Sequence, residues 1–336
     1  MSHARVSTAL LVMAFTGTAG CASAQRTPDA APSPAQGRLI GGVYRSDAGS
    51  REYRLYLPAT SAREARPLLV LLHGCTQSAD DIARGAALHE IADSTGMLVL
   101  YPEQPAAANP LRCWNWFDAA HQRRGAGEPA LLSAMVREIA SAQGADPRRV
   151  YVAGVSAGGA MALILAASYP ELFAAAGSHS GVPLAAATPA TALQVMRGGG
   201  VGDPAAVAAA RTDTRDPSSG DRSRLVPIIV FHGVDDAVVH VENGRATAAQ
   251  WRGAAGLAGL ANAETSTTGE AGGLTFRRSI AGPPDAPLVE LWLIDGLGHA
   301  WSGGSPAGTY TDPRGPVASD ELVRFLLQHR IPEDSR

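Results

Sequence analysis

A single serine, Ser156, stands between two glycines in the pentapeptide GVSAG at residues 154–158. An apolar, β-rich run precedes it and an alanine-rich, helical run follows it. This context is typical of a nucleophile elbow, a strained turn from strand to helix that exposes a serine hydroxyl. The pattern therefore indicates acyl transfer through Ser156, and the alternative interpretation is a serine that only caps the helix.

A serine hydroxyl becomes a good nucleophile only when a base takes its proton and an acid orients that base. Asp235 and Asp236 follow a strongly apolar run, and His299 follows the next one on a glycine-flanked loop. The order Ser, Asp, His is the one expected for an elbow nucleophile. We take Asp236 as the acid and His299 as the base, with Asp235 and Asp295 as alternative acids.

Three other histidines are rival bases. His179 and His232 end apolar runs, where they are better placed to brace the floor of a site. His240 lies only a few residues after the aspartates, too close in sequence to reach the nucleophile independently. The sequence favours His299 over all three.

The developing oxyanion needs two N–H donors, one after the nucleophile and one from the loop after an earlier strand. The N–H of Ala157 is the first candidate. The run LLVLLHGC ends at Cys75, whose N–H is the second candidate. A nucleophilic role for the Cys75 thiol is the alternative, and it leaves the elbow unexplained.

Composition excludes several other chemistries. The chain of 336 residues contains no lysine, so a serine-lysine dyad, a Schiff base and a phosphate-loop lysine are all excluded. A formal net charge of -3 provides no basic stripe for nucleic acid. The predicted chemistry requires no cofactor, and the cysteines have no second pair at metal-ligand spacing.

The N-terminal segment has the pattern of an export signal. A short apolar run is followed by small residues and an Ala-X-Ala site that ends at Ala24, which predicts a signal peptide over 1–24 and secretion to the periplasm or medium. Cys21 is a possible lipoprotein anchor, and no run is long enough for a permanent membrane span. The segment 25–37, rich in Pro and Ala, is predicted to be a disordered tether.

Beyond the tether, residues 38–336 are predicted to form one catalytic domain of the α/β class. Short apolar runs at 51–58, 67–74, 97–102, 149–154, 174–181, 226–233 and 287–294 alternate with helical patterns at 78–95, 130–142 and 317–329. This alternation predicts a mostly parallel sheet with helices on both faces. The segment 185–224 is predicted to be an excursion over one edge of the sheet. The sequence gives no indication of an oligomeric state.

Processing of the signal removes Cys21 from the free thiols, so Cys75 and Cys113 remain. In an exported protein two cysteines favour one disulfide, and the alternative is two separate buried thiols. Trp114 and Trp116 adjoin Cys113, and Trp301 follows His299 by two residues. All three are candidate substrate-binding side chains, because aromatic rings in a cleft can bind acyl chains or rings. Equally, they could belong to the core.

Six motifs in order, HGCTQ, YPEQ, CWNWF, GVSAGGAM, HGVDDAVV and GHAWSGG, make the chain resemble the poly(3-hydroxybutyrate) depolymerase family of esterases. This family is similar to feruloyl and acetylxylan esterases of the α/β-hydrolase fold. The resemblance implies a triad of Ser156, Asp236 and His299, with a disulfide between Cys75 and Cys113. Asp235 departs from the family, which more often has a small residue there.

The resemblance implies an exported serine esterase that acts on hydroxybutyrate-type oligomers or related short hydroxyacyl esters. A polymer-binding module, which many extracellular depolymerases carry, is not found in the sequence. The alternatives are a feruloyl or acetylxylan esterase that acts on plant cell-wall polysaccharide, a peptidase on the same fold and, outside the enzymes, an inactive envelope or granule-binding protein.

Overall fold

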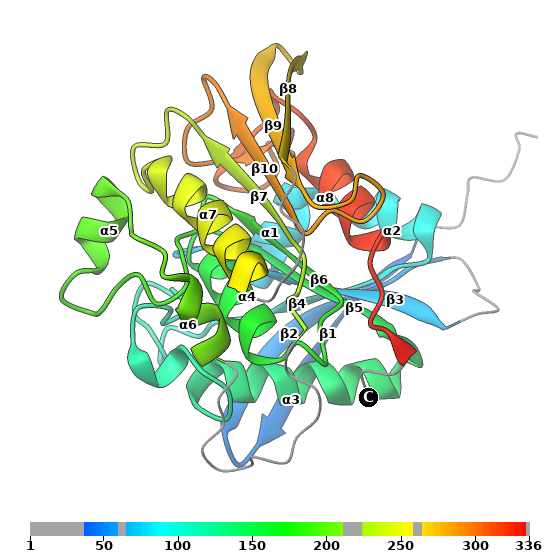
Figure 1. Ribbon diagram of the computed structural model, residues 1–336. Coiled ribbons are helices and arrows are strands. Elements are labelled where there is room, and N and C mark those ends of the chain that lie inside the picture. The colour runs from blue at the N-terminus through cyan, green and yellow to red at the C-terminus, as the bar shows by residue number, and fades with distance from the viewer. Residues whose placement is uncertain (1–36, 60–64, 211–223, 258–263, 334–336) are drawn as a thin grey trace, which may run out of the picture. The chain divides into compact units, whose positions relative to one another are not determined.

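A ten-stranded mixed sheet forms the centre of the computed structural model, which describes residues 37–59, 65–210, 224–257 and 264–333. Residues 35–336 form one compact unit, whereas the predicted signal peptide, Cys21 and nearly all of the predicted tether lie outside the described residues. The strands, in their spatial order, are β1 (Arg38–Ser46), β2 (Gly49–Leu57), β4 (Leu98–Pro102), β3 (Arg66–Leu72), β5 (Ala145–Val155), β6 (Ala175–His179), β7 (Ile228–Gly233), β10 (Val289–Ile294), β9 (Leu274–Ala281) and β8 (Glu264–Ala271) (Figure 1).

The inner strands from β4 to β10 are parallel to one another, and the outer strands on both sides are antiparallel. The helices are α1 (Ala79–Ala86), α2 (His89–Thr95), α3 (Gly127–Ala142), α4 (Ala157–Ser168), α5 (Ala192–Gly198), α6 (Pro204–Ala209), α7 (Glu242–Leu257) and α8 (Ala318–Leu327). A 3₁₀ turn (Ala119–His121) and a small pair of strands, β11 (Trp301–Ser302) and β12 (Thr311–Asp312), complete the described elements.

Alternate side chains of the buried strands enter two separate cores. In β3, Leu68, Val70 and Leu72 pack into one cluster with residues of α3, α4 and α7. Leu69 and Leu71 pack into the other with residues of α1, α2 and α8. Successive strand side chains point to opposite faces, so an unbroken apolar run requires helices on both faces. The predicted layering is confirmed (Figure 1).

The parallel register determines where the site forms. Leu72 at the end of β3 pairs with Gly154 in β5, and Val155 pairs with His179 in β6. Gly233 at the end of β7 pairs with Ile294 at the end of β10. Loops that follow parallel strands all leave the sheet at the carboxyl ends of these strands, which is where ligands bind in such folds.

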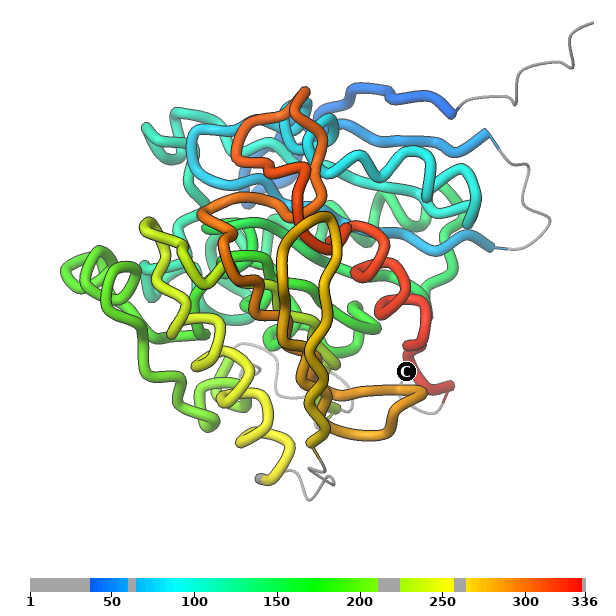
Figure 2. Tube along the Cα trace, turned by 90° about the horizontal axis from the view of Figure 1, so that it is seen from above, coloured from blue at the N-terminus to red at the C-terminus, as the bar shows by residue number. Residues whose placement is uncertain are grey.

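The structure differs from the sequence-based prediction at several elements. The sequence pattern does not indicate β1, α7 or the β8–β9 hairpin, whose strand β8 reads ETSTTGEA and is mostly exposed. In Figure 2 this hairpin lies between α7 and α8. The single helix predicted over 78–95 is instead two, because Ala87 adopts a left-handed φ of 51° at the end of α1.

The predicted position of the excursion is wrong. Its described part, 185–210, connects β6 to β7, which are neighbours inside the sheet and not at its edge. Gln250 of α7 holds this segment through hydrogen bonds to the backbone of Leu184 (both 2.9 Å) and to the carbonyl of Asp203 (2.9 Å). These hydrogen bonds attach the segment to α7.

Candidate active site

Ser156 lies at the turn between β5 and α4, with φ 56° and ψ −121°. A non-glycine residue rarely adopts this backbone conformation, and such outliers cluster at active sites. The helix that follows is buried on every side, so it fixes the turn firmly. The strand, turn and helix predicted from the pentapeptide are all present.

The two glycines of the pentapeptide are required by close backbone approaches. A Cβ on Gly154 would lie 2.4 Å from the carbonyl carbon and oxygen of Gly158, and a Cβ on Gly158 would lie 2.3 Å from the carbonyl oxygen of Leu72. Contacts this short do not occur in real structures, so any larger residue would displace the turn. The glycines thus allow α4 to start directly against β3.

His299 and Asp236 form a hydrogen-bonded pair from the loops after β10 and β7. Nδ1 of His299 and Oδ2 of Asp236 are 2.7 Å apart. The other carboxylate oxygen of Asp236 accepts the backbone N–H groups of Val238 (2.9 Å) and Val239 (2.8 Å). The carboxylate is therefore held on both sides, with its second oxygen directed at the imidazole.

The electrostatics of this pair determine the tautomer of the ring. Burial alone would raise the pKa of Asp236, but the hydrogen bonds from His299 and Val239 outweigh burial and leave the pKa below its ordinary value. An ionised carboxylate only accepts hydrogen bonds, so Nδ1 of His299 carries the proton. Nε2 of the neutral ring is then unprotonated, which is the state that a general base needs.

The rival groups have other partners. Nε2 of His179 accepts the N–H of Ser302 (3.2 Å), and burial lowers the pKa of this histidine to about 3. His232 is buried and donates from Nε2 to the carbonyl of Val239 (2.7 Å), with the same atom 3.6 Å from Oδ2 of Asp236, whereas His240 accepts the N–H of Glu242 (3.3 Å). These contacts support packing and turns rather than proton transfer.

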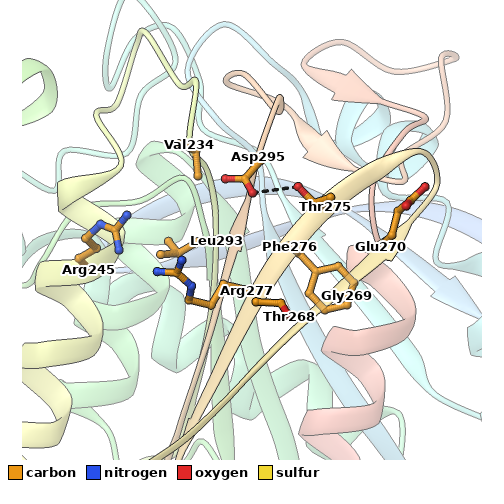
Figure 3. Close-up of a pocket in the computed structure, with 10 residues that line it drawn as sticks. All are labelled: Val234, Arg245, Thr268, Gly269, Glu270, Thr275, Phe276, Arg277, Leu293 and Asp295. Atoms are coloured by element: carbon orange, nitrogen blue, oxygen red, sulfur yellow. Dashed lines mark hydrogen bonds between the residues drawn. The ribbon is translucent and has the colours of Figure 1, made fainter.

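The alternative acids are also placed elsewhere. Asp235 is exposed. Asp295 accepts a hydrogen bond from the hydroxyl of Thr275 (2.9 Å) and lines a separate surface cavity of about 300 Å³ between α7 and the β8–β9 hairpin (Figure 3). This cavity contains none of Ser156, Asp236 and His299. Its position away from Ser156 makes it irrelevant to the chemistry of the elbow.

The loop after β3 lies against the serine. A Cβ on Gly74 would be 3.4 Å from that of Ser156. The carbonyl of Gly74 accepts from Nδ1 of His73 (2.7 Å), whose Nε2 accepts the N–H of Gln104 (3.0 Å). Burial lowers the pKa of His73 to about 4, so the ring is neutral. Because this carbonyl and the N–H of Cys75 belong to one planar trans unit, His73 also orients that N–H.

Cys75 and Cys113 form a disulfide in the structure. The bond ties the loop after β3 to the segment that carries Trp114 and Trp116. Within the described ranges, no hydrogen bond uses the N–H of Cys75. Ala157 is the first residue of α4, so no intrahelical acceptor exists for its N–H. Both donors predicted for the oxyanion are thus located beside Ser156.

Two cavities meet at Ser156. The larger, of about 260 Å³, is apolar and includes Cys75, Ala157, Trp116, Phe117 and Met196. The smaller, of about 150 Å³, has a polar rim and includes Gly74, Thr76, Gln77, His299 and Tyr310. Ser156 and His299 therefore line one cavity, although no hydrogen bond between their side chains is found in the described part of the chain.

The three candidate tryptophans have different positions. Trp116 lines the apolar cavity. Trp114 is fully buried and donates from Nε1 to the carbonyl of His73 (3.0 Å), and Trp301 is buried with Nε1 donating to the hydroxyl of Ser319 (3.1 Å). Trp114 and Trp301 line neither cavity at Ser156. Trp116 thus lies at the wall of the cavity beside Ser156, whereas Trp114 and Trp301 belong to the core away from it.

Sequence reasoning does not find several residues that shape the site. Met196 of α5 lines both cavities, and Asn243, which is fully buried, holds this helix through the carbonyls of Val195 (2.9 Å) and Met196 (3.2 Å). Tyr310 comes from a loop with no recognisable motif. The helical pattern TALQVMRGG is the one signal that could have indicated α5.

No helix in the described ranges has both the length and the apolar character that a membrane crossing requires. Over the same ranges, no group of three or more His, Cys, Asp or Glu side chains could hold a metal ion.

Comparisons with known proteins identify the family. A family model described as "Esterase PHB depolymerase" matches residues 51–272. Poly(3-hydroxyalkanoate) depolymerase C of Paucimonas lemoignei is 31% identical over 273 residues, which are 80% of this chain and 61% of that protein. Feruloyl esterase B of Neurospora crassa is 28% identical over 295 residues, which are 85% of this chain and 88% of that protein. The chain thus spans less than two thirds of the depolymerase.

Among solved structures, an acetyl xylan esterase from Aspergillus awamori superposes with a TM-score of 0.66 at 23% identity, over 87% of this chain and 100% of that one. An S-formylglutathione hydrolase from Agrobacterium tumefaciens has a TM-score of 0.53 at 17% identity, over 88% and 97%. At this identity the likeness concerns the fold, which is the predicted α/β-hydrolase fold.

Proposed function

Because the chain belongs to the PHB depolymerase family of esterases, we propose that it hydrolyses carboxylic esters through a triad of Ser156, His299 and Asp236. The observation that carries the proposal is the hydrogen bond of 2.7 Å between Nδ1 of His299 and Oδ2 of Asp236. The loops that carry these two residues leave the sheet at the carboxyl ends of its parallel strands, as does the strained turn at Ser156. His299 takes the proton of Ser156 as the hydroxyl attacks the ester carbonyl.

The N–H groups of Cys75 and Ala157 hold the oxyanion that develops in this step. His299 then donates the proton from Nε2 to the leaving alcohol, and the acyl group remains on Ser156. In the second half of the reaction, water loses its proton to His299 as it attacks the acyl carbonyl. His299 then returns this proton to Oγ of Ser156 as the bond to the acyl group breaks, which releases the acid and restores the free serine. No cofactor takes part in this scheme.

The two cavities suggest how the ester is oriented. The apolar cavity adjoins both oxyanion donors but not His299, so it takes the acyl chain, with Trp116 against it. The smaller cavity contains His299, which must reach the leaving oxygen, so it takes the alcohol part. A cavity of about 260 Å³ suits a short acyl chain better than a long fatty one.

We propose hydroxybutyrate-type oligomers and related short hydroxyacyl esters as the substrate class. Feruloyl or acetylxylan ester hydrolysis is the alternative, supported by the similarity to a feruloyl esterase over most of its length. Rates on hydroxybutyrate oligomers, methyl ferulate, acetylated xylan and p-nitrophenyl butyrate test both. Fastest turnover of the oligomers supports the proposal, and fastest turnover of a cell-wall ester supports the alternative. Turnover of none of the four contradicts esterase activity and favours a binding protein.

Export is also part of the proposal. The signal pattern over 1–24 supports it, and a disulfide between Cys75 and Cys113 is expected to persist only in an oxidising compartment. A mature N-terminus at Gln25, read by mass spectrometry, indicates signal cleavage, whereas an acyl group on Cys21 indicates a lipoprotein. An unprocessed N-terminus at Met1 contradicts export by this signal.

The disulfide should contribute strongly to stability. Its cysteines are 38 residues apart in sequence. Closing a loop of this size reduces the conformational entropy of the unfolded chain and so raises the free energy of the unfolded state by about 4 kcal/mol. Reduction with dithiothreitol should therefore lower the free energy of unfolding in urea by about this amount.

A Cys75→Ser, Cys113→Ser double variant provides the control for the reductant. It should unfold at the same urea concentration with and without dithiothreitol, close to the reduced wild type. An unchanged wild-type midpoint after complete reduction would show that the bond does not stabilise the fold.

A further inference from the structure

Two exposed hydroxyl side chains close the polar rim of the smaller cavity. Tyr310 is 48% exposed, and its hydroxyl lies 3.2 Å from that of Thr76. The ring of Tyr310 stands edge-on to His299, with 6.2 Å between ring centroids. The phenol therefore lies next to the imidazole that must protonate the leaving alcohol, on the side of the cavity where that alcohol departs.

Both residues have a backbone conformation that is unusual for their type. Thr76 has φ 65° and Tyr310 has φ 51°. Positive φ is rare for any residue other than glycine and is a clear outlier for a β-branched one. Such strain persists only where the surrounding structure holds it, and it is concentrated at ligand-binding sites.

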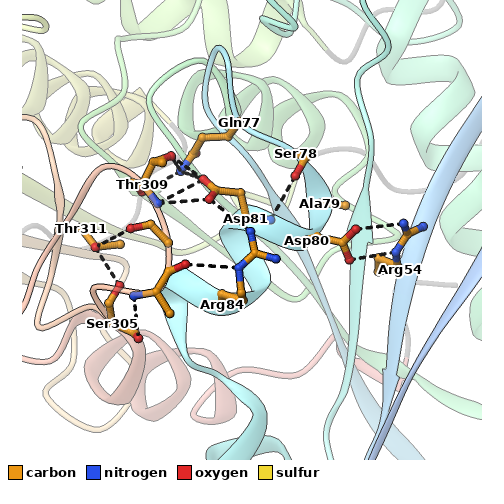
Figure 4. Close-up of polar contacts among 12 residues, drawn as sticks. Arg54, Gln77, Ser78, Ala79, Asp80, Asp81, Arg84, Ser305, Thr309 and Thr311 are labelled. Carbon is orange, nitrogen blue, oxygen red and sulfur yellow. Dashed lines mark hydrogen bonds and ion pairs between the residues drawn. The ribbon is translucent and has the colours of Figure 1, made fainter.

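A polar clamp holds the Tyr310 loop against α1 and the loop after β3 (Figure 4). Asp81 accepts hydrogen bonds from the N–H and the hydroxyl of Thr309, and from Nε2 of Gln77 (3.0 Å). The same Nε2 donates to the carbonyl of Thr309 (2.9 Å).

On its other side, Oε1 of the buried Gln77 accepts the N–H of Gly74 (2.8 Å). Thr311 closes the loop internally by donating to the carbonyl of Ser305 (2.8 Å), whose N–H donates to the carbonyl of Gly85 (2.9 Å). The loop with the phenol is thus fixed relative to the loop with the oxyanion donor.

The phenolic oxygen of Tyr310 can accept a further hydrogen bond. The hydroxyl of Thr76 has one proton and donates it to the carbonyl of Cys75 (2.6 Å). Tyr310 therefore donates to Thr76, and the lone pairs of its phenolic oxygen remain open to a hydrogen-bond donor. If a ligand carbonyl approaches instead, the phenolic proton can turn toward it.

From these contacts we infer that Tyr310 determines specificity for the alcohol part of the ester, by binding a second oxygen function carried close to the ester oxygen. A sugar provides a hydroxyl there, and a hydroxyacid unit provides a carbonyl. Simple alkyl esters have neither group, so Tyr310 should not distinguish them. The inference rests on the proposed esterase function and names the alcohol class that this cavity accepts.

Four butyrate esters test it in two matched pairs. The hydroxyl pair is 2-hydroxyethyl butyrate and propyl butyrate, and the carbonyl pair is methyl (butyryloxy)acetate and 2-methylbutyl butyrate. Within each pair the acyl chain is the same and the alcohol parts have similar shapes. Tyr310→Phe keeps the ring and removes only the hydroxyl.

Tyr310→Phe should lower kcat/KM by about 2- to 10-fold for at least one oxygenated ester, as expected for one lost hydrogen bond, mainly through a higher KM. The two alkyl esters should be unaffected. A lower kcat/KM for 2-hydroxyethyl butyrate but not for propyl butyrate indicates sugar-like alcohols. A lower kcat/KM for methyl (butyryloxy)acetate but not for 2-methylbutyl butyrate indicates hydroxyacid units. Tyr53→Phe, which removes a hydroxyl from β2 outside both cavities, is the matched control and should change none of the four rates.

An equal change of all four rates in Tyr310→Phe, or no change in any, would overturn the inference. Failure of the proposed function gives a different result, because the wild type would then hydrolyse none of the four esters.

Discussion

Replacing Ser156 with alanine should lower kcat for p-nitrophenyl butyrate by about 10⁶-fold, the loss found when the nucleophile of a serine triad is removed. The substitution deletes only the hydroxyl. The strained turn, both glycines and the helix behind it remain, so the variant should fold normally. Residual turnover would come from the oxyanion donors and the bound geometry alone.

The measurement is steady-state hydrolysis by wild type and Ser156→Ala, with circular dichroism of both to establish that the fold is retained. A folded variant that keeps a rate within tenfold of wild type would exclude Ser156 as the nucleophile.

The second large effect is expected at Asp236. In Asp236→Asn, the amide group can donate a hydrogen bond to Nδ1 of His299, which favours the tautomer with its proton on Nε2. That ring cannot accept the proton of Ser156, and the corresponding change in a serine triad costs about 10⁴-fold in kcat. The neighbouring side chain supplies a control, because Asp235 is exposed and has no contact with His299 among those described.

Asp235→Asn should therefore keep nearly full activity, whereas Asp236→Asn should lose almost all of it. The two variants make the same chemical change at adjacent positions, so their kcat values can be compared directly. The reverse result, with Asp235→Asn inactive and Asp236→Asn active, would move the acid by one residue and contradict the observed pair.

Much of the architecture could be predicted because buried strands have a strongly hydrophobic sequence pattern. The apolar runs at 67–72 in β3, 150–155 in β5, 228–233 in β7 and 289–294 in β10 are buried and carry few polar residues. Their alternation with helices determines a parallel sheet, and the parallel sheet places the following loops at one edge. The positions of Ser156, Asp236 and His299 along the chain follow from this logic.

The elements that the sequence did not indicate are those that lack such a pattern. The β8–β9 hairpin has many exposed residues, so its strands carry little hydrophobic signal. The break at Ala87 depends on one left-handed residue that is not a glycine. Local propensity does not predict this backbone conformation, because the surrounding tertiary contacts impose it.

The walls of the site were the hardest part to predict. Met196 and Tyr310 reach Ser156 from segments that carry no recognised motif, and tertiary hydrogen bonds, including those from Asn243, Asp81 and Gln77, hold these segments there. The tryptophans illustrate the reverse problem. Composition makes each a candidate for substrate contact, but only packing distinguishes Trp116, at the cavity, from Trp114 and Trp301 in the core.

Covalent labelling tests the central claim most directly. A fluorophosphonate ester reacts with an activated serine and leaves its phosphonyl group on the oxygen, with loss of fluoride. After incubation with the folded protein, intact mass should increase by one phosphonyl group, and peptide mapping should place it on Ser156. Esterase activity should fall in parallel with labelling. Labelling of another residue, or full activity after complete labelling of Ser156, would contradict the assignment of this serine as the nucleophile.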